Sequence, residues 1–347
     1  MAGNLEFIKQ VTSSATSTVS VTDVFTSTYD VYAVSFDWIK QTSGNVNLRL
    51  IDSGGSVISD SEYDFAYLAT NSFNSFSQYR QTNQTSYPEL FFASTTVGGG
   101  EMAYIFNPND SSSYTFLLGN YTGYYDGAGG GGLGRKQIGV HKVAEQITGL
   151  QLVCQSGTIS ATINVYGVRW IMAGSLIKIQ EEIVTSAVAS VELGGANWDS
   201  SYDVYMVKMN NVSVGTVNAN VYLRVTESGT PNTTSNYDFA YKQLRADTTF
   251  SNVSSTNQAE WELSGSLEDE AGKTFNNITY IFNANNSSEF TFITTEQVYM
   301  ADGGTMLGNQ GGGVFTVTSS VDGVNIFLDS PTADIDSGTF TLYGLKK

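Results

Sequence analysis

The pentapeptide YDFAY occurs twice in this sequence of 347 residues, at 63–67 and at 237–241. Other short motifs recur in the same order, and each pair lies 173 to 177 residues apart. They are YDVY at 29–32 and 202–205, YIFNPND at 104–110 with YIFNANN at 280–286, and NVYGV with TLYGL, which end at Val168 and Leu345. A chain of this length has room for two domains. The repeat therefore predicts two consecutive domains with the same fold, joined near residues 172–175.

The local pattern within each copy is that of β-strands. Tyr32, Val34 and Phe36 alternate with smaller or polar residues, as in a strand with one buried face. Helical periodicity appears only weakly, around residues 184–191. Frequent strands in a unit of this size favour two antiparallel sheets packed face to face. We therefore predict an all-β fold, two tandem antiparallel β-sandwich (jelly-roll-like) domains related by internal duplication, at residues 1–171 and 176–347.

Charge and hydropathy exclude several classes of partner. The chain has 33 acidic and 16 basic residues, and its formal net charge of −17 repels a phosphate backbone. We therefore expect no nucleic-acid partner. The N-terminus lacks a basic stretch followed by an apolar run, and no segment offers the roughly 18 apolar residues of a membrane span, so we expect neither a secretory signal nor a membrane partner. The single cysteine allows no internal disulfide.

The repeated motifs carry a resemblance to a known group of proteins. YDVY leading into a strand, an LRL-type strand, YDFAY, an aromatic-Ile-Phe-Asn turn and a closing Tyr-Gly strand together resemble a β-sandwich module of virion structural proteins of tailed bacteriophages, particularly marine and cyanobacterial ones. The resemblance extends from about residue 7 to residue 345 in both copies. It implies a virion component that is assembled in the host cytoplasm and binds other virion proteins. It brings no functional residues with it.

The duplication also provides a test of candidate catalytic residues. The only histidine, His141, lies opposite Phe315 in the other copy, and Cys154 lies opposite Leu328. Both positions therefore favour packing over chemistry, and a single histidine cannot form a His-based metal cluster within one chain. Paired carboxylates can catalyse glycoside hydrolysis, but with 33 acidic residues some pair is found at any spacing, so such a pair does not indicate a catalytic site. We predict no enzymatic activity, no cofactor and no metal site.

The glycine-rich run at 126–136 formally contains GxGxxG. A dinucleotide-binding loop opens a helix, whereas the sequence here continues into a strand-like segment. We therefore interpret the run as a long hairpin connection. Tyr121, Tyr124, Tyr125 and Asp126 directly before it, or at its start, form the candidate interface or glycan contact, because clustered tyrosines anchor protein interfaces or stack on sugars.

These observations favour a non-enzymatic phage virion structural protein, either a capsid decoration or head fibre or a tail accessory component. One alternative is a carbohydrate- or receptor-binding module that attaches to a host surface glycan. Another is a double jelly-roll capsid protein that forms the shell itself. The chain has few lysines and only 4 prolines to protect exposed sheet edges. We therefore expect a homo-oligomer, with a trimer favoured, that contacts a larger scaffold through segments such as 121–136.

Overall fold

The structure is a computed structural model, and it describes residues 5–72, 76–91, 99–125, 131–168, 176–198, 201–215, 218–329 and 333–346. Within these ranges the chain is built of β-strands, and the short 3-10 turn Gly195–Asn197 is their one helical element. The predicted all-β fold with antiparallel sheets is therefore confirmed. The described residues include no helix that is long and apolar enough to cross a membrane.

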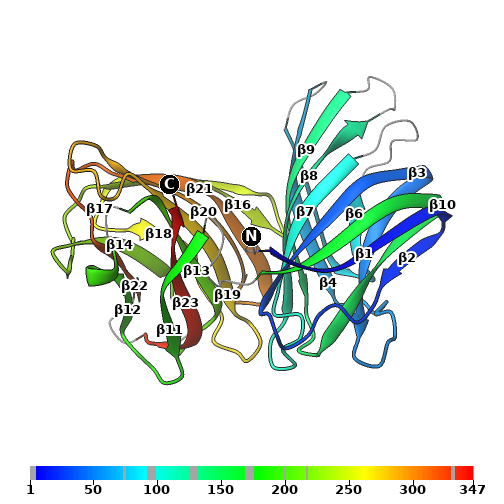
Figure 1. The fold of residues 1–347 in the computed structure, drawn as a ribbon, viewed down its shortest axis with the longest axis horizontal. Helices are drawn as coiled ribbons and strands as arrows, with labels where there is room; N and C mark the ends of the chain where they lie inside the picture. Colours follow the sequence, from blue (N-terminus) through cyan, green and yellow to red (C-terminus); the bar gives the residue numbers. More distant parts are fainter. Residues whose placement is uncertain are drawn as a thin grey trace. The chain divides into compact units, whose positions relative to one another are not determined.

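The chain separates into two compact units, whose strands run from blue to green and from green to red in Figure 1. The N-terminal unit comprises residues 5–168 together with the short segment Arg245–Thr249. The C-terminal unit comprises the rest of the described chain from residue 176. The predicted domain limits, 1–171 and 176–347, include ends outside the described residues and stay a prediction.

One ten-stranded antiparallel sheet forms the N-terminal unit. Its order is β1-β10-β3-β7-β8-β9-β4-β5, while β2 pairs with β10 and β6 pairs with β3. The strands are β1 (Leu5–Thr16), β2 (Thr18–Val21), β3 (Val31–Asp52), β4 (Tyr63–Asn71), β5 (Ser77–Gln84), β6 (Tyr87–Phe91), β7 (Gly99–Phe106), β8 (Thr115–Tyr125), β9 (Gly131–His141) and β10 (Ile147–Val168).

The two longest strands, β3 and β10, are bent, so that this one sheet forms both layers around the hydrophobic core. One end of β10 pairs with β1 and the other with β2, and the register between β10 and β3 is irregular in the middle. Gly44 and Gly157 lie at this irregularity with positive φ angles of 72° and 85°. Bends of this kind allow one strand to serve both layers of a sandwich. A single hydrophobic core therefore receives side chains from both halves of β3, such as Phe36 and Leu48.

Two separate sheets form the C-terminal unit. The eight-stranded sheet has the order β11-β23-β13-β19-β20-β21-β16-β17, and the five-stranded sheet has the order β12-β22-β14-β15 with β18 paired to β14. The strands are β11 (Leu176–Val184), β12 (Ser190–Gly194), β13 (Tyr202–Val214), β14 (Val221–Glu227), β15 (Thr230–Pro231), β16 (Tyr237–Arg245), β17 (Ser251–Gln258), β18 (Trp261–Glu262), β19 (Phe275–Phe282), β20 (Thr291–Ala301), β21 (Thr305–Phe315), β22 (Gly323–Leu328) and β23 (Ile335–Lys346).

The order of strands is the same in both large sheets when they are compared from β1 and from β11. Tyr32 of β3 lies opposite Ile105 of β7, and Tyr205 of β13 lies opposite Ile281 of β19. The other pairs that the repeat predicts also occupy matching register positions: Leu48 with Leu223, Tyr104 with Tyr280, and Tyr166 with Tyr343. The repeated motifs therefore occupy equivalent places in the two large sheets, and the internal duplication stays a prediction.

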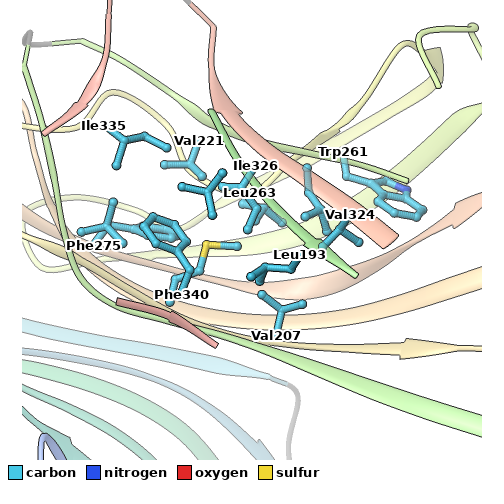
Figure 2. Close-up of a cluster of buried hydrophobic side chains, with 14 of the residues drawn as sticks. Leu193, Val207, Val221, Trp261, Leu263, Phe275, Val324, Ile326, Ile335 and Phe340 are labelled. Atoms are coloured by element: carbon cyan, nitrogen blue, oxygen red, sulfur yellow. The ribbon is translucent and has the colours of Figure 1, made fainter. Parts of the chain in front are cut away.

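The YDFAY motifs lie on β4 and β16 and contribute to the two cores. Tyr63 and Tyr237 are fully buried. The hydroxyl of Tyr63 accepts a hydrogen bond from the backbone of Leu50 (3.0 Å) and donates one to Ile58 (3.2 Å). Tyr237 forms the equivalent pair of bonds in its own unit. The buried aliphatic and aromatic side chains of the C-terminal core, among them Trp261 and Phe340, are shown in Figure 2.

Candidate functional site

The tyrosine cluster that the sequence singles out is divided between the inside and the outside of the N-terminal unit. Tyr121 is buried in the core, whereas Tyr124 is 41% exposed. Both belong to β8, as does the backbone of Tyr125, so these residues lie in a strand. Asp126 lies outside the described residues. Because Tyr121 is enclosed, it cannot stack on an external sugar ring, and of these tyrosines the structure shows an exposed ring only for Tyr124.

Part of the glycine-rich run lies in a strand, and its residues 126–130 lie outside the described residues. Its residues 131–136 belong to β9. Gly139, further along this strand, lies so close to Tyr87 that a Cβ atom there would come within 2.6 Å of the ring. Gly313 of β21 has the same relation to Trp261, at 2.5 Å. Glycine is therefore needed at this position in both units, because a large aromatic residue of β6 or β18 packs against the strand.

A buried polar cluster lies beside Tyr121. Glu101, Arg135 and Gln137 come from β7 and β9 and are almost inaccessible to solvent. The Gln137 side-chain amide donates a hydrogen bond to Glu101, and the Arg135 guanidinium lies 4.1 Å from the centre of the Tyr67 ring. Burial raises the pKa of Glu101 to about 8, against the opposing effects of Gln137 and Arg135. Burial also raises the pKa of Tyr121 to about 12. The cluster thus holds a carboxyl group that is largely neutral at pH 7.

The corresponding region of the C-terminal unit is polar but neutral. Asn277 and Gln297 occupy the positions of Glu101 and Tyr121. The Asn277 amide donates to Thr295 (2.8 Å), and Asn309 donates to the backbone of Leu263 (2.8 Å). Both units therefore bury polar side chains at this place, and the N-terminal unit has a carboxyl and a guanidinium group among them, those of Glu101 and Arg135.

His141 is buried at the end of β9, as its packing role predicts, and its ring lies 5.0 Å from that of Tyr63. Its Nε2 atom, however, faces two carboxylates, at 3.1 Å from Glu62 Oε2 and 3.6 Å from Glu145 Oε1. Burial lowers the pKa of His141, and the hydrogen bond and charge of Glu62 oppose this effect. Burial and the charges of Glu62, Asp52 and Asp60 raise the pKa of Glu145.

Sequence reasoning missed this group of three. Glu62 is 79 residues away from His141, and no motif connects them. The repeat does contain a signal, because Asn236 and Ser319 stand at the positions of Glu62 and Glu145 in the C-terminal unit. With Phe315 at the position of His141, the C-terminal unit has no ionisable side chain at any of the three positions.

Cys154 is a buried thiol of β10. It donates weak hydrogen bonds to the backbone oxygens of Ser43 (3.2 Å) and Ser156 (2.9 Å). Burial raises its pKa, which disfavours the reactive thiolate. These surroundings agree with a packing role and supply none of the basic partners that a nucleophilic cysteine needs.

Each large sheet has two edge strands, β1 and β5 in the N-terminal unit and β11 and β17 in the C-terminal unit. Among the described residues, β1 pairs only with β10 and β11 pairs only with β23. Each of these edge strands contains a single lysine and no proline. Each also exposes a large apolar side chain, Phe7 (56% exposed) on β1 and Ile183 (64%) on β11. Such edges are templates for pairing with another chain.

A shallow pocket of about 250 Å³ lies beside the edge strand β11. It is lined by Glu182, Ile183 and Val184 of β11 and by Val188, Val191 and neighbouring residues that lead into β12. A second pocket of about 240 Å³ includes Gln180, Glu192 and Gly194. The C-terminal unit thus offers a partly apolar groove where the edges of its two sheets approach each other.

Comparisons with known proteins give distant structural similarities. No protein-family model and no curated protein matches the sequence. Domains LG4-5 of the mouse laminin alpha1 chain cover 95% of this chain and 86% of their own at 10% identity, with a TM-score of 0.20. The LG1-3 region of the laminin alpha2 chain gives 95% and 64% coverage, 10% identity and a TM-score of 0.21. The STIV MCP gives 98% and 95% coverage, 9% identity and a TM-score of 0.16. At these TM-scores the similarity assigns no function.

Proposed function

We propose that this chain is a non-enzymatic structural protein of a bacteriophage virion, a capsid decoration, head fibre or tail accessory component, that acts by binding other virion subunits. The proposal is supported by the resemblance of its repeated motifs to a phage virion module and by the tandem all-β architecture. The observation that carries it is that the edge strands β1 and β11 each expose a large apolar side chain, Phe7 and Ile183.

The energetics of the two edges favour contact with another protein. Burying a large apolar side chain such as Phe7 or Ile183 contributes about 1.5–3 kcal/mol. Backbone pairing along a strand of nine or more residues, such as β1 or β11, adds directional hydrogen bonds. A monomer with two such edges is exposed to uncontrolled association, so an ordered partner is the simplest way to cover them.

Self-association is part of the proposal, with a trimer as the proposed stoichiometry. Identical chains with a net charge of −17 repel one another at long range. Salt screens this repulsion over a Debye length of about 8–10 Å near physiological ionic strength. Association through apolar edges is therefore expected to strengthen as salt is added.

The function is tested by co-sedimentation of the purified chain with phage particles that lack it. The wild-type chain is expected to sediment with the particles in a saturable manner. Phe7→Lys and Ile183→Lys are expected to weaken this binding by at least about tenfold, because each places a charge on an apolar edge. Trp38→Lys is the matched control, since Trp38 is 73% exposed but belongs to the inner strand β3.

Two results would contradict the proposal. One is a folded wild-type chain that stays in the supernatant with particles at every concentration. The other is a loss of binding with Trp38→Lys as large as that with the edge variants, because the contact would then not depend on β1 and β11.

A further inference from the structure

Three side chains with metal-ligand chemistry meet at one end of the N-terminal unit. They are His141, Glu62 and Glu145, and one ligand atom from each lies within 4.8 Å of the other two. The imidazole is wholly buried and directs Nε2 between the carboxylates, while each carboxylate is about one-third exposed. One face of the group is therefore held by the protein and the other is open to solvent.

The three residues are positioned by the ends of strands. Glu62 directly precedes β4, His141 is the last residue of β9, and Glu145 lies in the short connection to β10. The backbone amide of Lys142 donates to the carbonyl of Glu62 (2.9 Å), which fixes the two strand ends to each other. The connection ends at Ile147, whose amide donates to Pro108 (2.6 Å). Both ends of the segment that carries Glu145 are thus anchored.

The distances from His141 to the two carboxylates are close to those in a site for a small cation. Zn²⁺ binds imidazole nitrogen and carboxylate oxygen at about 2.0–2.2 Å, which places neighbouring ligand atoms of a tetrahedral site about 3.3–3.6 Å apart. The distances from Nε2 of His141 to Glu62 and Glu145 are 3.1 Å and 3.6 Å. An imidazole with two carboxylates favours a divalent transition metal over Ca²⁺ or Mg²⁺, which prefer oxygen ligands alone.

The charge around the group also favours a cation. Among the described residues, His141 is the only ion-pair partner of Glu62 and Glu145. The neighbouring Lys142 is engaged with Asp64 (2.8 Å) and with Asn83 (2.6 Å). Asp52 and Asp60 add negative charge near Glu145. The carboxylates therefore lack a full positive counter-charge.

The C-terminal unit is a natural negative control. Asn236, Phe315 and Ser319 stand at the positions of Glu62, His141 and Glu145. The fold is retained there without any of the three ligands, so their joint presence in the N-terminal unit is not required by the architecture.

We propose that Glu62, His141 and Glu145 bind one divalent transition-metal cation, represented by Zn²⁺, with a position left open to water. This inference is independent of the proposed virion function. Nδ1 of His141 is buried without a hydrogen-bond partner in the described part of the chain. Metal-bound histidines usually donate this second nitrogen to an acceptor. The affinity for Zn²⁺ is therefore expected to be lower than that of a structural zinc site.

Equilibrium dialysis and calorimetric titration of the full chain with Zn²⁺ test the proposal. The wild type is expected to show one saturable site per chain. Glu62→Gln and Glu145→Gln are each expected to weaken it by at least about tenfold, as is usual when a supporting residue of a metal site is lost. A triple variant, Glu62→Asn with His141→Phe and Glu145→Ser, copies the C-terminal unit and is expected to abolish the site. Glu289→Gln removes the same charge from an exposed turn and is the control.

Far-UV circular dichroism and thermal unfolding of each variant show whether the fold is retained. Because Glu62 and Glu145 are partly exposed, their glutamine variants are expected to fold normally and to give a valid measurement even if the triple variant does not. Absence of saturable Zn²⁺ binding by the wild type would overturn the proposal. Unchanged binding by the folded glutamine variants, or Ca²⁺ binding as tight as that of Zn²⁺, would also overturn it, because the group would then be an ordinary acidic surface.

Discussion

The tyrosine at the start of each YDFAY motif ties its strand to a neighbouring segment of the same unit. In the N-terminal unit the Tyr63 hydroxyl connects the backbone amide of Leu50 to the carbonyl of Ile58. Tyr237 connects Val225 and Asn232 in the same way. In both units the tyrosine hydroxyl thus provides hydrogen-bond partners for a buried backbone amide and a backbone carbonyl at equivalent places.

Tyr63→Phe removes this hydroxyl and leaves a buried donor and acceptor without their partner. We expect the free energy of unfolding to fall by about 1–3 kcal/mol, the usual cost of leaving such groups unsatisfied. Urea denaturation measures it. Tyr124→Phe, which removes the hydroxyl of an exposed ring, is expected to change the stability by less than about 0.5 kcal/mol. Equal effects of the two changes would contradict the assigned role of the buried hydroxyl.

Glu101 makes the stability of the fold depend on pH. Its pKa in the folded protein is about 8, above the ordinary value of 4.5, so the folded state holds this proton more tightly than the unfolded chain. The contribution of Glu101 to stability is therefore greatest below pH 4.5 and is lost as the pH rises towards 8. Glu101→Gln keeps the shape of the neutral carboxyl group and is expected to flatten this fall in urea titrations between pH 5 and pH 8. A fall of the same size in the variant would show that Glu101 is not its cause.

The chemistry of single residues could be predicted only where the repeat supplied a comparison. Phe315 opposite His141 correctly indicated a packed ring, and Leu328 opposite Cys154 indicated a buried thiol. The two carboxylates beside His141 could not be foreseen, because Glu62 approaches it through the antiparallel pairing of β4 with β9 and Glu145 through the course of the connection to β10. The burial of Tyr121 follows from the alternation of buried and exposed side chains along β8. The glycine-rich sequence that follows gives no indication of this strand.

At the scale of the strands, the two units differ in how their sheets are joined. In the N-terminal unit β3 and β10 continue through a bend, whereas β13 and β14, and likewise β22 and β23, are separate strands in the C-terminal unit. The alternating sequence pattern predicts each strand, but it does not show whether two successive strands form one continuous, bent strand. In the N-terminal unit the bend contains Gly44 and Gly157, whose φ angles are positive.

Gly44→Ala tests the bend. The φ angle of 72° is unfavourable for alanine, and its Cβ atom would lie 2.5 Å from the Ser156 hydroxyl oxygen. Gly55→Ala is the matched control, because φ is 81° there and no atom lies within 4 Å. Both changes are expected to cost about 1–2 kcal/mol of backbone strain, and Gly44→Ala about 1–3 kcal/mol more from the contact. Equal losses in chemical denaturation would show that the bend is not sterically constrained.

The sequence predicted that unprotected edge strands exist, but it did not predict which strands they are. The low number of lysines and prolines predicted unprotected sheet edges. Which strands form those edges follows only from the topology, which places β1 and β5 at the ends of one sheet and β11 and β17 at the ends of the other. The predicted contact segment 121–136 instead belongs largely to β8 and β9, which are inner strands of the sheet.

At the scale of the whole molecule, two units with one strand order account for the repeat, and neither unit contains a predicted catalytic group. The repeat made the order of strands predictable, because each strand of one copy has a counterpart in the other. The resemblance to phage virion modules predicted an assembling protein. The exposed edges give that prediction a physical basis, since the same two strands that complete the fold leave one side available for pairing.

Sedimentation of the purified chain across a salt series tests most directly the central claim, which is that the protein assembles through its sheet edges. With a net charge of −17, association is expected to strengthen as salt screens the repulsion between identical chains. The account predicts a homo-oligomer whose fraction rises with ionic strength and falls with Ile183→Lys. A chain that sediments as a monomer at every concentration and ionic strength would contradict it.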